Sequence, residues 1–146
     1  MTAHWEFAWG PQHFQELAQR LKHPVLAINC YNKQSGKRPF QGSIVLQRRG
    51  LRVGVIGVAA TIIDKSIPPR FSEGLRFTSG IDELPAEIAK LRSSEGVHLI
   101  VVLSHLGFPQ DVRLAKIVDG IDVVVSGHAH NRLDHPPRIG ETLIIQ

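Results

Sequence analysis

Histidine residues follow two apolar runs in the second half of the chain. Residues 97–103 lead into His105, and residues 121–125 lead into His128 and His130. Side chains at the carboxyl ends of neighbouring parallel strands converge on one crevice, so the two runs bring their histidines together if both are strands. Imidazole is the commonest metal-binding side chain in proteins. The pattern therefore predicts a metal site.

His128 and His130 are separated by one residue, and Gly127 precedes them. In extended backbone, side chains two residues apart point to the same face, so both rings can bind one ion or two adjacent ions. A glycine before them allows the chain to turn sharply off the strand. The alternative is that these are loop histidines without a function. The strand-then-loop context of both motifs favours the site.

The composition is typical of an ordinary globular domain. The chain has 146 residues, 42% of them hydrophobic and 21% charged, which suits a single domain. Its net charge of +4 comes from basic residues scattered in short groups, so no nucleic-acid partner is predicted. No apolar run is long enough to span a membrane and no export signal is recognisable, so no membrane partner and no compartment are predicted.

Hydrophobic periodicity predicts an α/β fold. Strands at 97–103 and 121–125 joined by a helix at 109–117 form a βαβ unit, which implies parallel pairing. Residues 61–77 show no period and are expected to form a long irregular connection. The other predicted elements are a helix opening after Pro11 and ending before Pro24, a helix at 82–92, strands at 25–30 and 142–145, a polar loop at 31–39, and a hairpin of strands 43–47 and 51–58.

Several motifs resemble those of a known family. The Ser-Gly-His-Ala-His motif at 126–130 resembles the Gly-His-x-His signature of the calcineurin-like metallophosphoesterases, and Ser-His-Leu-Gly at 104–107 resembles their single-histidine motif. Residues 3–10 stand where the bacterial 5'-nucleotidase branch has Gly-Asn-His-Glu-Phe-Asp-Tyr-Gly, and residues 27–29 and 54–57 also match that branch. The resemblance covers essentially the whole chain.

The resemblance implies a four-layer α/β/β/α sandwich, of which residues 1–146 are a single partial catalytic domain, incomplete at both ends. Two family motifs are absent, a strand ending in Asp-x-His and another ending in Gly-Asp, which supply ligands and the carboxylate that bridges two metal ions. The chain is therefore expected to be a fragment, or an internally started reading frame, of a longer enzyme. The missing strands predict self-association through an exposed sheet edge.

The resemblance also implies the metal ligands. His105 and His128 would bind one ion and His130 the other, giving two divalent ions in the full-length family. His4 stands where the family has a metal-binding asparagine. Imidazole in place of an amide oxygen favours Zn, Mn or Fe over a hard ion such as Mg.

The catalytic and substrate-binding residues are less well defined. Trp5 occupies the position of the family's general acid, and an indole cannot supply a proton near neutral pH, so the catalytic residues stay unassigned. The His-Trp-Glu-Phe sequence is similar to that of the thiosulfohydrolases of bacterial sulfur oxidation. Asn29 at a strand tip, and Asn131 and Arg132 after the histidine motif, are the candidates for substrate binding.

Three functions follow from these observations. The first is a metal-dependent hydrolase of phosphate monoesters, 5'-nucleotidase-like, whose partner is a small phosphate ester such as a nucleotide and whose nucleophile is a metal-activated water. The second is a thiosulfohydrolase-like enzyme that releases sulfate. The third is an inactive metal-binding fragment, favoured by the missing carboxylate motifs.

Overall fold

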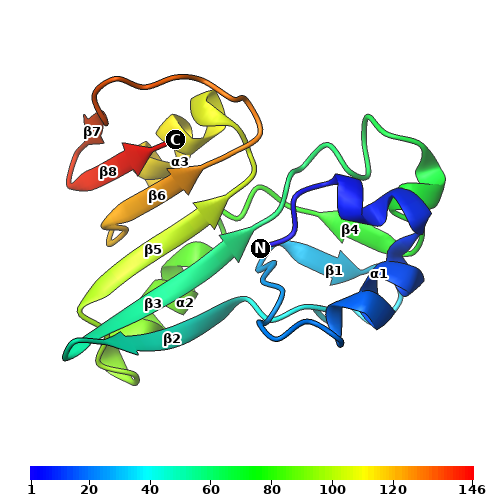
Figure 1. Ribbon diagram of the computed structural model, residues 1–146, viewed down its shortest axis with the longest axis horizontal. Coiled ribbons are helices and arrows are strands. Elements are labelled where there is room, and N and C mark those ends of the chain that lie inside the picture. Colours follow the sequence, from blue (N-terminus) through cyan, green and yellow to red (C-terminus); the bar gives the residue numbers. More distant parts are fainter.

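The computed structural model describes residues 1–146 and contains two parts, a larger one built on a six-stranded sheet and a smaller one around a two-stranded sheet (Figure 1). In the larger sheet the strands follow the order β2-β3-β5-β6-β8-β7. Strands β3, β5, β6 and β8 run parallel, and β2 and β7 are antiparallel edges. The strands are β2 (Ser43–Arg48), β3 (Leu51–Val58), β5 (Leu99–Ser104), β6 (Val123–Ser126), β7 (Arg138–Ile139) and β8 (Thr142–Ile145).

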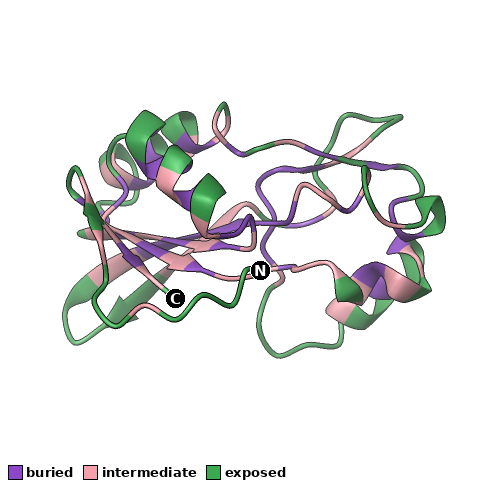
Figure 2. Cartoon of the chain, turned by 90° about the horizontal axis from the view of Figure 1, so that it is seen from above, coloured by how far each residue is buried: buried purple, intermediate pink, exposed green.

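Two helices cover one face of this sheet. Helix α2 (Leu84–Ser93) precedes β5, and α3 (Phe108–Ile117) connects β5 to β6 (Figures 1 and 2). Their apolar side chains, Leu91 and Leu114 among them, join an aliphatic core with the inward-facing residues of the strands. The predicted βαβ unit is therefore confirmed. No helix of the structure combines the length and the apolar character that crossing a bilayer requires.

The other face of the sheet is apolar and carries no helix (Figure 2). Burial alternates along the central strands, with Ile100 and Val102 fully buried and Val101 and Leu103 only half-buried. Register places further half-buried aliphatic residues beside these, because Val101 pairs with Val123 in the next strand. The result is a continuous half-covered apolar surface across β5, β6 and β8.

The smaller part has an aromatic core. It contains η1 (Trp5–Trp9), α1 (Pro11–Ala18), η2 (Pro69–Phe71) and the antiparallel pair β1 (Cys30–Asn32) and β4 (Leu75–Phe77). The ring of Phe7 is fully buried and packs edge-on against Phe14 and Phe77, with centroids 4.9 and 5.6 Å away. Trp9, in contrast, is 79% exposed, so the expectation that it anchors helix packing is wrong.

The hairpin 43–58, the helix at 109–117 and the strand at 142–145 were predicted correctly to within about one residue, whereas the region from 25 to 39 was not. No strand spans 25–30, because its backbone bonds to several partners in turn: Ala27 N–H donates to Gln41 and Ile28 N–H to Gly57. These residues are buried between two cores, which gives an apolar run without a ladder. Strand β1 instead enters the expected loop at 31–39, and the connection 61–77 contains η2 and β4.

Candidate metal centre

Three histidines from distant parts of the sequence meet at the junction of the two parts. His4 lies just before η1, His105 follows β5, and His128 follows β6. One ring nitrogen from each lies within 4.8 Å of the others, and all three side chains are half-buried. The three rings are spaced 5.0 to 5.1 Å apart, centroid to centroid. Of the predicted ligands, the structure therefore brings together three.

Strand register explains the placement of His105 and His128. Ser104 and Ser126, which close β5 and β6, are paired across the two parallel strands. The Gly127 N–H donates to the Ser104 carbonyl at 2.9 Å and holds the second loop close to the first. A Cβ atom at Gly127 would lie 2.9 Å from Nδ1 of His105, closer than Cβ atoms normally approach other heavy atoms, so this position requires glycine.

The backbone at His128 and His130 corrects one expectation. Their φ angles are +76° and +52°, in the left-handed region, so the segment is not extended and the argument that both rings share one face does not apply. His130 is exposed and lies outside the group formed by the other three histidines. The loop therefore presents one histidine to the cluster.

The surroundings keep the imidazoles neutral. Burial, and next the neighbouring His4 and His128, lower the pKa of His105 to about 4, and Glu6 acts weakly in the opposite direction. Burial and then His128 also lower the pKa of His4. Because a metal binds the unprotonated ring, this environment favours the ligand form at neutral pH.

Two features of the trio fit a zinc-like ion. The Nδ1 atom of His128 is buried and has no hydrogen-bond partner, while Nε2 of His105 lies 3.1 Å from Nδ1 of His4. Three neutral nitrogen donors with an open fourth position match the ligand set of catalytic zinc sites. No carboxylate belongs to the group, so the trio suits one ion and lacks the bridging ligand that a pair of ions requires.

A buried carboxylate braces the two strand ends that carry His105 and His128. Asp111, in the first turn of α3, is fully buried and accepts hydrogen bonds from the hydroxyls of Ser104 at 2.5 Å and Ser126 at 2.6 Å. Burial raises the pKa of Asp111, and the two hydroxyl donors act against that rise. The sequence interpretation placed Asp111 only at the helix terminus. A serine before each histidine motif was the signal that it missed.

The other candidate residues lie apart from the trio. Asn29 is fully buried and its amide is occupied, accepting from the Ala59 N–H and donating to the carbonyls of Ala59 and Thr78. The prediction that Asn29 lines a substrate pocket is therefore corrected: it ties the two parts of the molecule together. Asn131 and Arg132 are exposed, and Arg132 pairs with Asp134 at 3.0 Å in a solvated ion pair.

Trp5 is 66% exposed, and its ring lies 5.3 Å from the ring of His4. The position that the resemblance assigns to a general acid is therefore beside the trio and is filled by an indole, which does not ionise near neutral pH.

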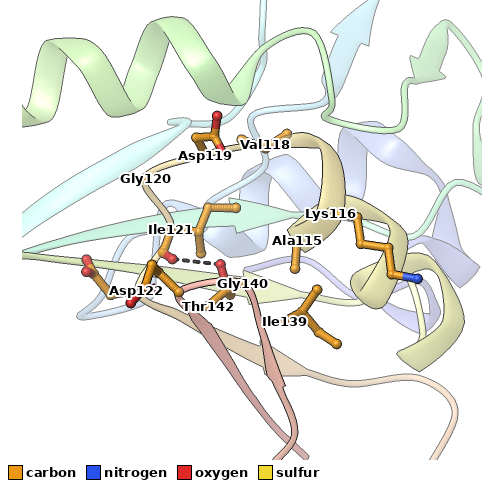
Figure 3. Close-up of a pocket in the computed structure, with 11 residues that line it drawn as sticks. Ala115, Lys116, Val118, Asp119, Gly120, Ile121, Asp122, Ile139, Gly140 and Thr142 are labelled. Carbon is orange, nitrogen blue, oxygen red and sulfur yellow. Dashed lines mark hydrogen bonds between the residues drawn. The ribbon is translucent and has the colours of Figure 1, made fainter.

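A hollow of about 560 Å³ opens at the opposite end of the sheet, between the end of α3 and the residues that precede β6 and β8 (Figure 3). Its lining is held by a hydrogen bond from the Thr142 hydroxyl to the carbonyl of Ile121, 2.8 Å long. Asp122 in this lining is engaged by Arg92 at 2.6 Å and by the N–H of Ile100. None of the candidate residues lines the hollow, so it is separate from the histidine cluster.

Comparison with known proteins gives clear relatives, although no protein-family model matches. The chain is 34% identical over 123 residues to an apyrase of Tabanus yao, which covers 80% of this chain and 22% of the apyrase. It is 30% identical over 118 residues to a 5'-nucleotidase of Vibrio cholerae, which covers 73% of this chain and 21% of the nucleotidase. The chain thus spans about a fifth of the length of these curated relatives.

Solved structures give the same result. The sulfate thiohydrolase SoxB of Thermus thermophilus, in complex with glycerol, superposes with a TM-score of 0.91 at 31% identity, over 97% of this chain and 26% of that chain. A 5'-nucleotidase precursor, also from Thermus thermophilus, superposes with a TM-score of 0.82 at 26% identity, over 99% and 32%. The chain is therefore homologous to a segment of the 5'-nucleotidase and apyrase family, and the thiohydrolase SoxB is among its structural relatives.

Proposed function

We propose that this chain is the histidine-bearing segment of a metal-dependent hydrolase of phosphate monoesters, with a nucleotide as substrate. The observation that carries the proposal is the convergence of His4, His105 and His128, three neutral nitrogen donors around one point. The names of the relatives, apyrase and 5'-nucleotidase, support a nucleotide as the substrate class.

The chain's own residues have distinct roles in this proposal. The trio holds a divalent ion of the Zn, Mn or Fe type, which when bound supplies positive charge that polarises a phosphoryl oxygen and acidifies a water molecule. His130, exposed on the same loop, remains a proposed ligand of a second ion that needs a carboxylate from outside residues 1–146. Asn131 and Arg132 follow it, and the guanidinium can donate two parallel hydrogen bonds to a phosphate.

Hydrolysis of a phosphate monoester breaks the bond between phosphorus and the ester oxygen and forms a bond from phosphorus to a water oxygen. The leaving oxygen then needs a proton. Trp5, beside the trio, cannot supply that proton. We therefore propose that bulk water protonates the leaving group in this chain, which gives slow turnover at best.

A second candidate, a thiohydrolase that releases sulfate, is favoured by the same residue. Trp5 stands in a His-Trp-Glu-Phe sequence, and SoxB is the solved structure with a TM-score of 0.91. A third candidate, metal binding without turnover, is favoured by the absence of a carboxylate from the cluster.

The finer architecture also belongs to the proposal. The helix-free apolar face of the six-stranded sheet supports its being one of the two inner surfaces of an α/β/β/α sandwich, because such a face is stable only when a second layer covers it. Residues 1–146 are then one partial catalytic domain. Pairing of two copies through an edge strand, β2 or β7, is the alternative way to cover the open sheet.

The metal proposal is tested by titrating the purified chain with Zn²⁺ and Mn²⁺ in a calorimeter. We expect one ion per chain, and a loss of affinity of at least about 100-fold in His105→Ala and His128→Ala. His13→Ala is the control, since His13 is an exposed residue of α1 and should leave affinity unchanged. Equal affinities in all four proteins would refute the site.

The substrate is tested separately with the metal-loaded chain. Release of phosphate from adenosine monophosphate, lost in His128→Ala, supports the phosphoesterase. Release of sulfate from S-sulfocysteine without phosphate release supports the thiohydrolase instead. Metal binding with neither product supports the inactive fragment.

A further inference from the structure

The fully buried carboxylate of Asp111 joins the two strand ends that carry His105 and His128. We propose that Asp111 is a positioning residue, which sets the distance and angle between these two imidazoles and thereby the affinity and geometry of the metal site. The inference rests on the metal site proposed above and names a part of it that neither the resemblance nor the comparisons assign.

The hydrogen bonds of Asp111 reach both strands at once. Its Oδ1 accepts from Ser104 in β5 and its Oδ2 accepts from Ser126 in β6, so a single rigid carboxylate spans the register pair that closes the two strands. No cation pairs with the carboxylate, so its charge is balanced by these hydroxyl dipoles alone. A negative charge only needed at a helix terminus would be placed in solvent, where it costs little desolvation.

The brace extends to the backbone on both sides of His105. The Ser104 hydroxyl donates to Asp111 and accepts from the N–H of Leu106 at 3.1 Å, so the residues before and after His105 are tied to the same oxygen. Strand β5 is thereby fixed beyond its last ladder bond, and the His105 side chain leaves a backbone that is held on two sides.

On the neighbouring strand, the brace acts through Gly127. Ser126 is held by Asp111, and the next residue, Gly127, donates to the Ser104 carbonyl and faces the His105 ring at van der Waals distance. A shift of Ser126 by a few tenths of an ångström would therefore move Gly127 against His105 and carry His128 with it. Metal ligands act within tolerances of this size, because preorganised geometry determines affinity.

The competing interpretation is that Asp111 only stabilises the fold. Thr142 provides a matched control, because it too is a buried hydroxyl residue of the same sheet with one side-chain hydrogen bond, to Ile121, at the far end of the strands. A purely structural role predicts that Ser126→Ala and Thr142→Val have the same consequences. A positioning role predicts that only the first alters the metal site.

The experiment compares the full chain with Asp111→Asn, Ser126→Ala and Thr142→Val in three measurements: Zn²⁺ affinity, the visible absorption spectrum of the Co²⁺ form, and thermal unfolding of the metal-free protein. We expect Asp111→Asn and Ser126→Ala to weaken Zn²⁺ binding by about 10- to 100-fold and to shift the Co²⁺ bands. Thr142→Val should lower the melting temperature by a similar amount while keeping its affinity within about twofold and its Co²⁺ spectrum unchanged.

The positioning role is overturned if Asp111→Asn retains both affinity and spectrum, or if affinity falls with melting temperature alike in all three variants. Failure of the parent chain to bind Zn²⁺ or Co²⁺ would refute the metal site itself. Positioning is then decided without metal by the imidazole nitrogen resonances of His105 and His128. These should shift in Ser126→Ala and not in Thr142→Val, and identical spectra would overturn the role of Asp111.

Discussion

The two parts of the molecule place their histidines in different ways. The six-stranded sheet has an aliphatic core and sets His105 and His128 on adjacent strands, fixed by register and by the Asp111 brace. The smaller part has an aromatic core around Phe7 and supplies only His4, from the residue before a short 3-10 helix. The spacing of the first two rings is thus internal to one sheet. The position of the third depends on how the two parts dock.

That docking is built from backbone hydrogen bonds. Ile28 N–H donates to the Gly57 carbonyl at 2.8 Å, and Thr2 N–H donates to Leu26 at 3.1 Å. The Asn29 amide adds bonds to Ala59 and Thr78 from within the interior. His4 is therefore joined to the sheet through several short connections, and changes on either side of the junction should separate the behaviour of His4 from that of the other two histidines.

Phe7→Ala should have the largest effect. Phe7 is fully buried among Phe14, Phe40 and Phe77, so its truncation leaves a cavity in the small core and should cost about 3–5 kcal/mol of unfolding free energy. Urea denaturation monitored by circular dichroism measures this loss. Phe7→Leu, which keeps most of the volume, should lose less. Equal stability of the alanine variant and the parent would show that the aromatic part is not a cooperative unit.

Gly57→Ala should have the next largest effect, because it acts directly on the junction. A Cβ at this position would lie 2.4 Å from Cβ and 2.6 Å from the carbonyl oxygen of Leu26, so the two backbones must move apart. Overpacking of this kind costs typically about 1–3 kcal/mol. Zn²⁺ affinity should fall as well, since His4 follows the displaced segment.

Gly50→Ala is the control, with nothing within 4 Å of the added carbon. Because Gly50 has a φ of +82°, alanine there should cost some stability through backbone strain alone and leave Zn²⁺ affinity unchanged. If Gly57→Ala left Zn²⁺ affinity as it was, the position of His4 would not depend on this junction.

The same comparison explains what the sequence could predict. The β5–α3–β6 unit and the histidines at its strand ends were predictable, because uninterrupted apolar runs separated by a helix specify a parallel pair locally. The position of His4 beside them could be inferred only from a resemblance, since no local pattern relates residue 4 to residue 105. The brace was not predicted, because an aspartate in a first helical turn satisfies a local rule that hides its partners seven and fifteen residues away.

Acidification should have a smaller effect, through the histidine cluster. The folded-state pKa of His105 is about 4 against about 6.5 in an unfolded chain, so the unfolded state binds more protons between these values and the stability of the metal-free protein falls as pH drops from 6.5 to 4. The His105→Gln variant lacks this contribution. Its unfolding free energy, measured in urea at each pH, should gain on that of the parent as pH falls and then level off below 4. Parallel profiles would mean that the ring is not desolvated.

Arg132→Ala should have the smallest effect on stability and so isolates the exposed loop from both packed regions. Arg132 is 90% exposed in its side chain and its ion pair with Asp134 is solvated, so we expect a change in unfolding free energy within about 0.5 kcal/mol and no change in Zn²⁺ affinity. If the guanidinium contacts the substrate phosphate, the variant should instead raise the KM for adenosine monophosphate, and Asp134→Ala, which frees the guanidinium from its partner, should lower it. Unchanged KM values in both variants would remove Arg132 from the substrate site and leave the loop with His130 as its only candidate residue of chemical interest besides Asn131.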